Sequence, residues 1–203
     1  MKIIGITGQS GSGKGMLSKS FAKLGYVHAD ADKIYHGLLD TNKQLFGELV
    51  SAFGDDITRD GKIDRKALGK KVLGKENARK LLRLNKIAHK YVCREYIKLI
   101  LTLKEQNAKG LIIDAPLLIE ARLNVLCDTN IFVACSKETQ IERIMARDSI
   151  SRDAAILRLA SQKPLEFYAK HCEHFFLNDN SSIEDLDAFA KQIDSILNSE
   201  DKT

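Results

Sequence analysis

A glycine- and serine-rich segment near the N-terminus ends in a lysine. Gly8-Gln9-Ser10-Gly11-Ser12-Gly13-Lys14 follows an apolar run and precedes a stretch with helical spacing. Glycine permits positive φ, which turns successive N–H groups toward phosphate oxygens, and a helix N-terminus adds a positive dipole. A lysine at this offset reaches the β- and γ-phosphates of a nucleotide. We therefore expect a phosphate loop that binds ATP, and disfavour a turn without a ligand. The expected contacts are Gly8, Gly11, Ser12, Gly13 and Lys14.

The two residues after this lysine depart from the phosphate-loop pattern. The pattern continues with Ser or Thr, whose hydroxyl binds Mg²⁺, whereas this chain has Gly15 and Met16. Glycine in the first turn of a helix also costs up to about 1 kcal/mol relative to alanine. Two interpretations follow: water takes the vacant coordination position, since Mg²⁺ commonly retains several waters, or phosphoryl transfer is weakened or lost. We favour water, and keep both residues among the expected nucleotide contacts.

Acidic residues follow two further apolar runs. Asp30-Ala31-Asp32 comes after the second run, and Asp114 ends the third. Carboxylates at the carboxyl edge of a parallel sheet face the ligand crevice. Asp32 could take the proton from an attacking hydroxyl or hold a water on Mg²⁺; the alternative is that it only caps a helix beginning at Lys33. Asp114 resembles the acid that holds Mg²⁺ directly or through water.

Two arginines share one face of a predicted helix that begins after Ser136. Gln140, Arg143 and Arg147 recur at i, i+3 and i+7. The planar guanidinium matches phosphate oxygens, so this face could present two cations to a triphosphate. An ordinary solvated face is the alternative. We expect Arg143 and Arg147 to bind nucleotide from a lid.

Short apolar runs alternate with amphipathic stretches, which predicts an α/β fold with a five-stranded parallel sheet. The segment between the second and third strands is about eighty residues long, too long for one crossover helix, and it reads as helical throughout. The sequence predicts a core at 1–58, 107–136 and 174–203, a helical subdomain at about 59–106 and a lid at about 137–165. The predicted strands are Ile3–Thr7, Tyr26–Ala29, Leu111–Ile113, Asn130–Cys135 and Phe175–Leu177.

Composition excludes several classes of protein. No apolar run approaches the roughly 20 residues of a membrane helix, and no secretory signal is expected. The four cysteines form no C-x-x-C pair, so a zinc or redox motif is unsupported. The net charge of +5 is mild and spread along the chain. We expect a cytoplasmic protein without a membrane or nucleic-acid partner, and leave its oligomeric state open.

Taken together, these motifs resemble the dephospho-coenzyme A kinase family over nearly the whole chain. The phosphate loop alone would indicate only a P-loop protein, and the order and spacing of the other motifs are more specific. These motifs are Asp30-Ala31-Asp32, Phe53-Gly54, Asp60-Gly61, Asp64-Arg65, Leu84-Asn85 with His89, Asp114 to Glu120, Glu138 to Gln140 with Arg143, Arg147 and Asp148, Arg158, Gln162 to Leu165 and Asn178 to Asn180.

The resemblance implies a three-layer P-loop fold like that of nucleoside monophosphate kinases, with a helical acceptor domain and a lid. ATP would phosphorylate the ribose 3′-hydroxyl of dephospho-coenzyme A with the help of Mg²⁺. Asp32 matches the proposed base, and Lys14 and Arg143 would complete the catalytic set. By the same resemblance, the acceptor contacts would be Asp32, Arg65, His89, Pro116 and Leu117, Asn178 and Asn180 would lie near adenine, and Asp32 and Asp114 would hold Mg²⁺ through water.

One departure from the family lies in the acceptor region, where Lys90 replaces the usual proline after His89. It puts the local turn in doubt but not the chemistry. Two rival functions remain at this point: another small-molecule or nucleotide kinase, and a nucleotide-binding module with weakened catalysis because of Gly15.

Overall fold

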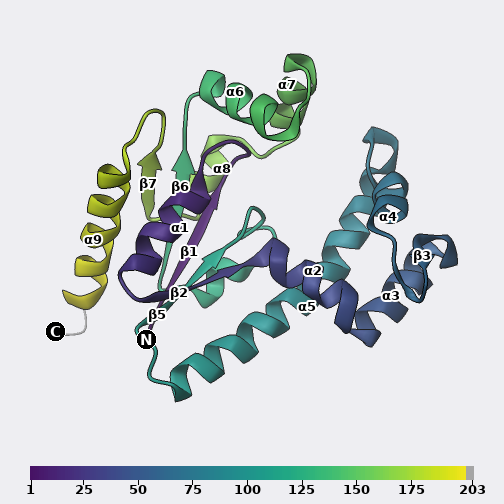
Figure 1. Ribbon diagram of the computed structural model, residues 1–203, viewed down its shortest axis with the longest axis horizontal. Coiled ribbons are helices and arrows are strands. Elements are labelled where there is room, and N and C mark those ends of the chain that lie inside the picture. Colours follow the sequence, from purple (N-terminus) through teal and green to yellow (C-terminus); the bar gives the residue numbers. More distant parts are fainter. Residues whose placement is uncertain (200–203) are drawn as a thin grey trace. The chain divides into compact units, whose positions relative to one another are not determined.

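A computed structural model describes residues 1–199, with Lys75 described through its backbone only. The chain divides into two compact units (Figure 1). The core unit consists of Met1–Asp30 and the chain from Leu103 onward, and the helical unit consists of Ala31–Thr102. The sequence placed the first boundary near residue 58. It lies earlier because the helices after Asp30 pack within the helical unit.

The core unit is built on the predicted five-stranded parallel sheet. Its strands are β1 (Lys2–Gly8), β2 (Tyr26–Asp30), β5 (Gly110–Asp114), β6 (Thr129–Ala134) and β7 (His174–Leu177). They lie in the order β2-β5-β1-β6-β7, and every neighbouring pair is parallel. The α/β prediction is therefore confirmed, with the phosphate-loop strand β1 in the centre.

Helices cover the sheet on both sides. On one face, α1 (Lys14–Lys23) packs against α9 (Ile183–Ser199), and both contribute to the apolar core formed with Ile4, Ile131 and Val133. The side chain of Phe132 leaves the opposite face, because neighbouring residues in a strand alternate. There it stacks on Tyr168 of α8 (Leu165–Ala169), with ring centroids 4.3 Å apart. The result is the three-layer arrangement expected from the resemblance.

Hydroxyl caps begin the helices that follow β6. Ser136 accepts a hydrogen bond at the start of α6 (Lys137–Asp148), where the sequence predicts a helix, and Ser151 does so for α7 (Arg152–Ala160). A capping box begins α9. Ser182 N–H donates to Asp185 Oδ2 at 2.8 Å, and Asp185 N–H donates to Ser182 Oγ at 3.1 Å. These are the cap and third positions of a helix that begins at Ile183.

The helical unit contains one element that the sequence reading missed. Its elements are α2 (Ala31–Thr41), α3 (Lys43–Phe53), η1 (Asp55–Ile57), β3 (Thr58–Arg59), β4 (Lys62–Ile63), α4 (Arg65–Val72), η2 (Lys75–Asn77) and α5 (Ala78–Glu105), whose residues from Leu103 onward are assigned to the core unit. The prediction of helix throughout is wrong at β3 and β4, which pair as a hairpin. The turn residues Asp60 and Gly61 have φ of 51° and 72°, the conformation that an Asp-Gly turn favours.

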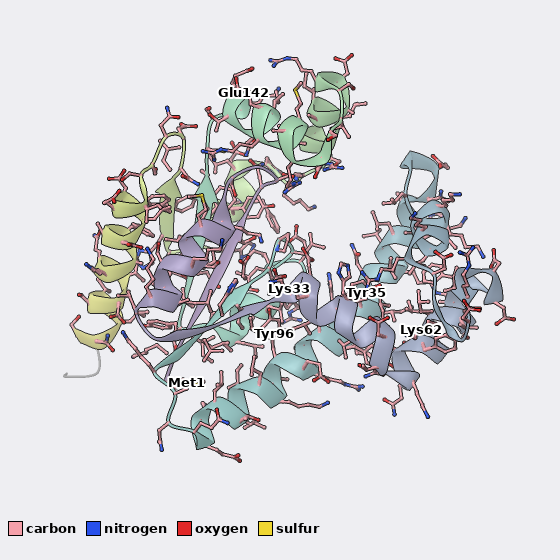
Figure 2. All side chains as sticks on the ribbon, viewed as in Figure 1. Met1, Lys33, Tyr35, Lys62, Tyr96 and Glu142 are labelled. Atoms are coloured by element: carbon pink, nitrogen blue, oxygen red, sulfur yellow. The ribbon has the colours of Figure 1, made fainter. Side chains whose placement is uncertain are left out.

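Helix α5 continues without interruption through the position where the family usually has proline. Lys90 has the backbone N–H that a proline would lack in a helix. Its ammonium lies 2.7 Å from Glu48 Oε2 on α3. Figure 2 shows Tyr35 on α2 and Lys62 on the hairpin of the same unit.

No helix within residues 1–199 combines the length and the apolar character needed to cross a membrane.

Candidate active site

The loop between β1 and α1 requires glycine at two positions for both conformation and space. Gly11 and Gly13 each have φ of +81°, a backbone that residues with a side chain rarely adopt. A Cβ on Gly11 would lie 2.7 Å from the carbonyl oxygen of Gln140, and one on Gly13 would lie 2.4 Å from Asn178 Nδ2. The loop is therefore held tightly between its own backbone and two distant segments of the core unit.

Asn178 is the buried support of this loop. The residue is 1% exposed, its Nδ2 donates to the carbonyl of Ser12 at 2.8 Å, and its backbone N–H donates to the carbonyl of Ala134 at 2.7 Å. The structure thus brings Asn178 to the phosphate loop from a position 164 residues after Lys14 in the chain. Asn180, assigned with it from the resemblance, is exposed.

Arg143 contacts the loop in a way that the sequence did not predict. Its Nη1 donates to the carbonyls of Gly11 at 3.3 Å and Asn178 at 2.9 Å, and its Nη2 donates to the carbonyl of Asp179 at 2.8 Å. Three of the five N–H groups of this guanidinium therefore hold the backbone of two loops together. Its contact with phosphate stays a prediction from the sequence.

Arg147 lies at the mouth of the loop, paired with its neighbour. Its Nη2 is 3.2 Å from Ser10 Oγ, and its Nε donates to Asp148 Oδ1 at 2.8 Å. The hydrogen bond from Arg147, with a second contribution from Arg158, holds the pKa of Asp148 at about 2. Asp148 therefore stays ionised and keeps Arg147 beside the loop.

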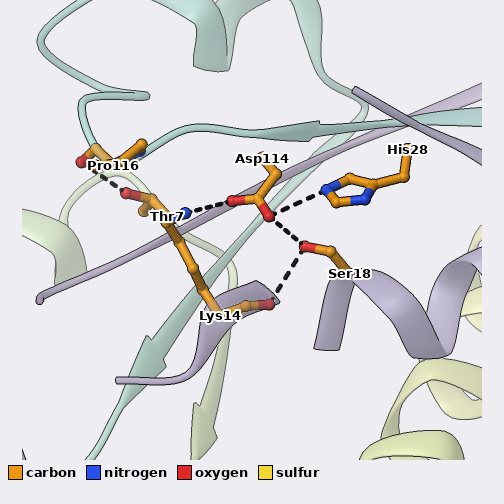
Figure 3. A network of polar contacts seen from close by, with 6 residues as sticks. All are labelled: Thr7, Lys14, Ser18, His28, Asp114 and Pro116. Carbon is orange, nitrogen blue, oxygen red and sulfur yellow. Dashed lines mark hydrogen bonds and ion pairs between the residues drawn. The ribbon is translucent and has the colours of Figure 1, made fainter. Parts of the chain in front are cut away.

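A polar network joins the phosphate loop to the end of β5 (Figure 3). The carboxylate of Asp114, whose residue is 2% exposed, lies at the end of β5. Lys14 Nζ is 2.6 Å from its Oδ1, while Ser18 Oγ at 2.9 Å and His28 Nε2 at 3.1 Å both face its Oδ2. Asp30 of β2 pairs with Asp114 in the strand register. The two acids therefore lie together at the carboxyl edge of the sheet, as predicted.

These donors keep the Asp114 carboxylate ionised although it is buried. Burial alone raises the pKa of this group, because a charge is poorly solvated in the interior. The hydrogen bonds from His28, Lys14 and Ser18 and the charge of Lys14 outweigh burial, and the pKa of Asp114 lies below its ordinary value. A permanently charged carboxylate therefore stands next to the lysine of the phosphate loop.

Ser18 and His28 are the two members of this network that the sequence reading missed. Ser18 lies four residues after Lys14, so both side chains lie on one face of α1, and helical spacing could have found it. His28 lies two residues before Asp30 on β2, so the two side chains leave the same face of the strand. Finding its contact with Asp114 requires the register between β2 and β5, which sequence spacing does not provide.

The residues at this edge fit a hydrated Mg²⁺. Among residues 1–199, no three His, Cys, Asp or Glu side chains gather as a ready metal cage. Mg²⁺ in kinases is commonly bound by one or two carboxylates, several waters and the substrate phosphates, so the Asp114 carboxylate is sufficient on this side of the site. A Cβ at Gly15 would meet no atom within 4 Å. The place of the usual hydroxyl is therefore open space, into which a water fits.

The phosphate loop also contains a buried serine hydroxyl. Ser12 is 1% exposed, and its Oγ has no hydrogen-bond partner in the structure.

The loop after β5 is tied to β1 by a side-chain hydrogen bond, in which Thr7 Oγ1 donates to the carbonyl of Pro116 at 3.2 Å. Leu117, the next residue, is 39% exposed. Of the two predicted acceptor contacts in this loop, Pro116 is thus held beside the phosphate-loop strand.

The remaining predicted acceptor residues belong to the helical unit. Asp32 lies exposed in the first turn of α2, which begins at Ala31, so the alternative of a cap on a helix beginning at Lys33 is wrong. Arg65 Nη2 lies 3.6 Å from Asp40 Oδ2, and both side chains are half exposed. His89 is half-buried on α5, and burial lowers its pKa.

Tyr35 is a further polar residue of the helical unit that the sequence reading did not single out. Its hydroxyl is buried and has no hydrogen-bond partner in the structure. Burial raises its pKa to about 12, against the opposing charge of Arg65. The Tyr35 hydroxyl lies close enough to Arg65 for their charges to interact. A ligand oxygen could accept a hydrogen bond from this hydroxyl.

Comparison with known proteins gives one consistent family. The model of the dephospho-coenzyme A kinase family matches residues 2–185. A dephospho-coenzyme A kinase of Carboxydothermus hydrogenoformans is 38% identical over 185 residues, which cover 91% of this chain and 88% of the relative. Among solved structures, the dephospho-coenzyme A kinase of Campylobacter jejuni superimposes with a TM-score of 0.68 at 27% identity over 99% of this chain and all of the other.

A second solved structure, the protein TT1252 from Thermus thermophilus, superimposes with a TM-score of 0.78 at 28% identity over 97% of each chain. The family match spans the phosphate loop, the Asp-Ala-Asp segment, the Asp114 strand and the arginine helix together. With a phosphate loop of intact backbone geometry, a buried acid paired to its lysine and a family match over nine-tenths of its length, this chain belongs to the dephospho-coenzyme A kinase family.

Proposed function

We propose that this protein transfers the γ-phosphoryl group of ATP to the ribose 3′-hydroxyl of dephospho-coenzyme A, giving coenzyme A and ADP. The observation that supports it most directly is the Lys14–Asp114 pair beneath an intact phosphate loop, in a chain of this family. The Gly15 departure leaves this pair untouched. Enzymatic function is therefore favoured over a binding module that has lost catalysis.

The donor side of the reaction is carried by the loop and α1. The loop N–H groups and the positive end of α1 surround the phosphates, and the Lys14 ammonium neutralises the charge that develops on the oxygen leaving the γ-phosphorus. Arg147 lies against Ser10 at the loop mouth, where its guanidinium can close over the phosphates. Arg143 acts mainly by holding the 178–179 backbone against the loop, and binds phosphate through its two remaining N–H groups.

The acceptor side depends on Asp32. In our proposal its carboxylate takes the proton of the 3′-hydroxyl as that oxygen bonds to the γ-phosphorus, and the bond from phosphorus to the β,γ-bridging oxygen breaks to release ADP. Mg²⁺, held through water by Asp114 and Asp32, would neutralise phosphate charge when bound. Arg65, His89, Pro116 and Leu117 remain the proposed contacts of the acceptor.

An assay that couples ADP release to NADH oxidation tests this function with ATP, Mg²⁺ and dephospho-coenzyme A. We expect turnover with dephospho-coenzyme A, and none with nucleoside monophosphates offered in its place. Asp32→Asn should abolish turnover while ADP affinity stays within twofold of the wild type, because the amide keeps the size but cannot accept a proton. Retained turnover in Asp32→Asn would reject Asp32 as the base.

A further inference from the structure

The support of Asp114 differs from what the phosphate-loop pattern leads one to expect. In that pattern the hydroxyl directly after the lysine binds the metal that the strand acid also holds. Here that position is Gly15, and two other side chains reach the acid. We propose that Ser18 and His28 are positioning residues that orient the Asp114 carboxylate and so let the loop work without a hydroxyl at position 15. This inference rests on the proposed phosphoryl transfer.

Ser18 contributes a hydroxyl from one helical turn further along α1. Its Oγ lies 2.9 Å from Asp114 Oδ2 and 3.2 Å from the carbonyl oxygen of Lys14, and the residue is fully buried. A hydroxyl has one proton, and a charged acceptor at the shorter distance takes it in preference to a neutral carbonyl. Ser18 therefore donates to the carboxylate, whose orientation is fixed relative to α1 and the loop.

His28 approaches the same oxygen from the edge strand. Its Nε2 lies 3.1 Å from Asp114 Oδ2, and its side chain is 26% exposed. Figure 3 shows this contact beside the one from Ser18. An ionised carboxylate only accepts, so Nε2 must carry a proton for this contact to be a hydrogen bond. With Ser18 and His28 on Oδ2, the other oxygen, Oδ1, is directed at Lys14. The carboxylate is thus held by donors from α1 and β2 at once.

The open space at Gly15 allows the compensating role of Ser18 to be tested. No atom lies within 4 Å of a Cβ built there, and the residue is not in the left-handed region. A serine side chain can therefore be introduced without strain. If Ser18 compensates for the absent hydroxyl, restoring one at position 15 should relieve the need for it. A purely structural role of Ser18 would give no such relief.

The experiment compares two buried serines on one helix. Ser18→Ala removes the donor to Asp114. Ser20→Ala is the matched control, because Ser20 is 3% exposed on α1 but its hydroxyl bonds Asp187 instead. The rescue is Gly15→Ser in the Ser18→Ala background. Measurements are kcat against Mg²⁺ concentration, ADP affinity by calorimetry with and without Mg²⁺, and thermal unfolding.

We expect Ser18→Ala to raise the Mg²⁺ concentration at half-maximal kcat about tenfold, and to weaken ADP binding in the presence of Mg²⁺ far more than in its absence. Ser20→Ala should match the wild type, and adding Gly15→Ser should restore Ser18→Ala to within about threefold. Equal Mg²⁺ dependence in the two alanine variants, or no rescue by Gly15→Ser, would overturn the assignment of Ser18.

His28 is tested by the same measurements with two substitutions. Gln places an amide N–H near the position of Nε2, so His28→Gln should keep the wild-type Mg²⁺ dependence, whereas His28→Ala should lose about tenfold. Equal values for the two variants would overturn the role of His28. The calorimetry separates this inference from the proposed reaction: a wild type that binds ADP with Mg²⁺ but does not phosphorylate dephospho-coenzyme A refutes the function, while the effect of Ser18 on Mg²⁺-dependent binding is still measured.

Discussion

Substituting Gly13 by alanine should damage the phosphate loop by an amount that the structure allows to be worked out. Gly13 has φ of +81°, and left-handed backbone costs a residue with a side chain about 1 to 2 kcal/mol. The added Cβ would also lie 2.4 Å from Asn178 Nδ2, which must move and loosen its hydrogen bond to the Ser12 carbonyl. That bond contributes about 1 kcal/mol. The total is about 2 to 3 kcal/mol.

This cost appears as lower stability if the loop keeps its shape, or as weaker nucleotide binding if the loop relaxes. Denaturant unfolding and calorimetric titration with ADP should together account for the 2 to 3 kcal/mol, so that a loss confined to binding would be about 30- to 150-fold. Gly15→Ala is the matched control: its Cβ meets nothing within 4 Å, and it should raise stability by up to about 1 kcal/mol. A Gly13→Ala protein with wild-type stability and ADP affinity would refute this reasoning.

Two further outcomes are expected. Arg143→Lys replaces the two separated nitrogens, Nη1 and Nη2, by a single one, which cannot span the carbonyls that they bond. Amide exchange at residues 178–179 should therefore accelerate by tenfold or more, and unchanged exchange would contradict the bracing role. Burial depresses the folded-state pKa of His89 below the ordinary 6.5, so the unfolded chain takes up a proton first and stability falls as the pH drops below 6.5. Urea unfolding at pH 7.5 and 5.5 should show a smaller pH dependence in His89→Gln, and an equal dependence would count against this.

The sequence predicted what depends on local spacing. The phosphate loop, the five strands and the helix start at Ser136 are each encoded within a few neighbouring residues, and the structure confirms their placement. The family resemblance is confirmed as well. The β3–β4 hairpin was missed although Asp60-Gly61 signals it, because strands of two residues carry no detectable alternation.

What the sequence could not provide depends on contacts between distant segments. The carbonyl of Ser12 is satisfied by Asn178, and the orientation of Asp114 depends on His28, across separations that no periodicity reports. The same holds for Arg143: helical spacing placed it on the face toward the loop, but only the packed structure shows that its guanidinium is occupied by backbone carbonyls. The unit boundary at Asp30 also follows from packing, since composition does not change there.

The most direct test of the central claim is the identity of the product. Purified protein incubated with ATP, Mg²⁺ and dephospho-coenzyme A should convert the acceptor into coenzyme A, identified by mass spectrometry and by the ³¹P signal of a ribose 3′-phosphomonoester. One coenzyme A should form for each ADP released. If the folded protein binds ADP tightly at saturating Mg²⁺ but forms no 3′-phosphorylated product, the proposed reaction is contradicted.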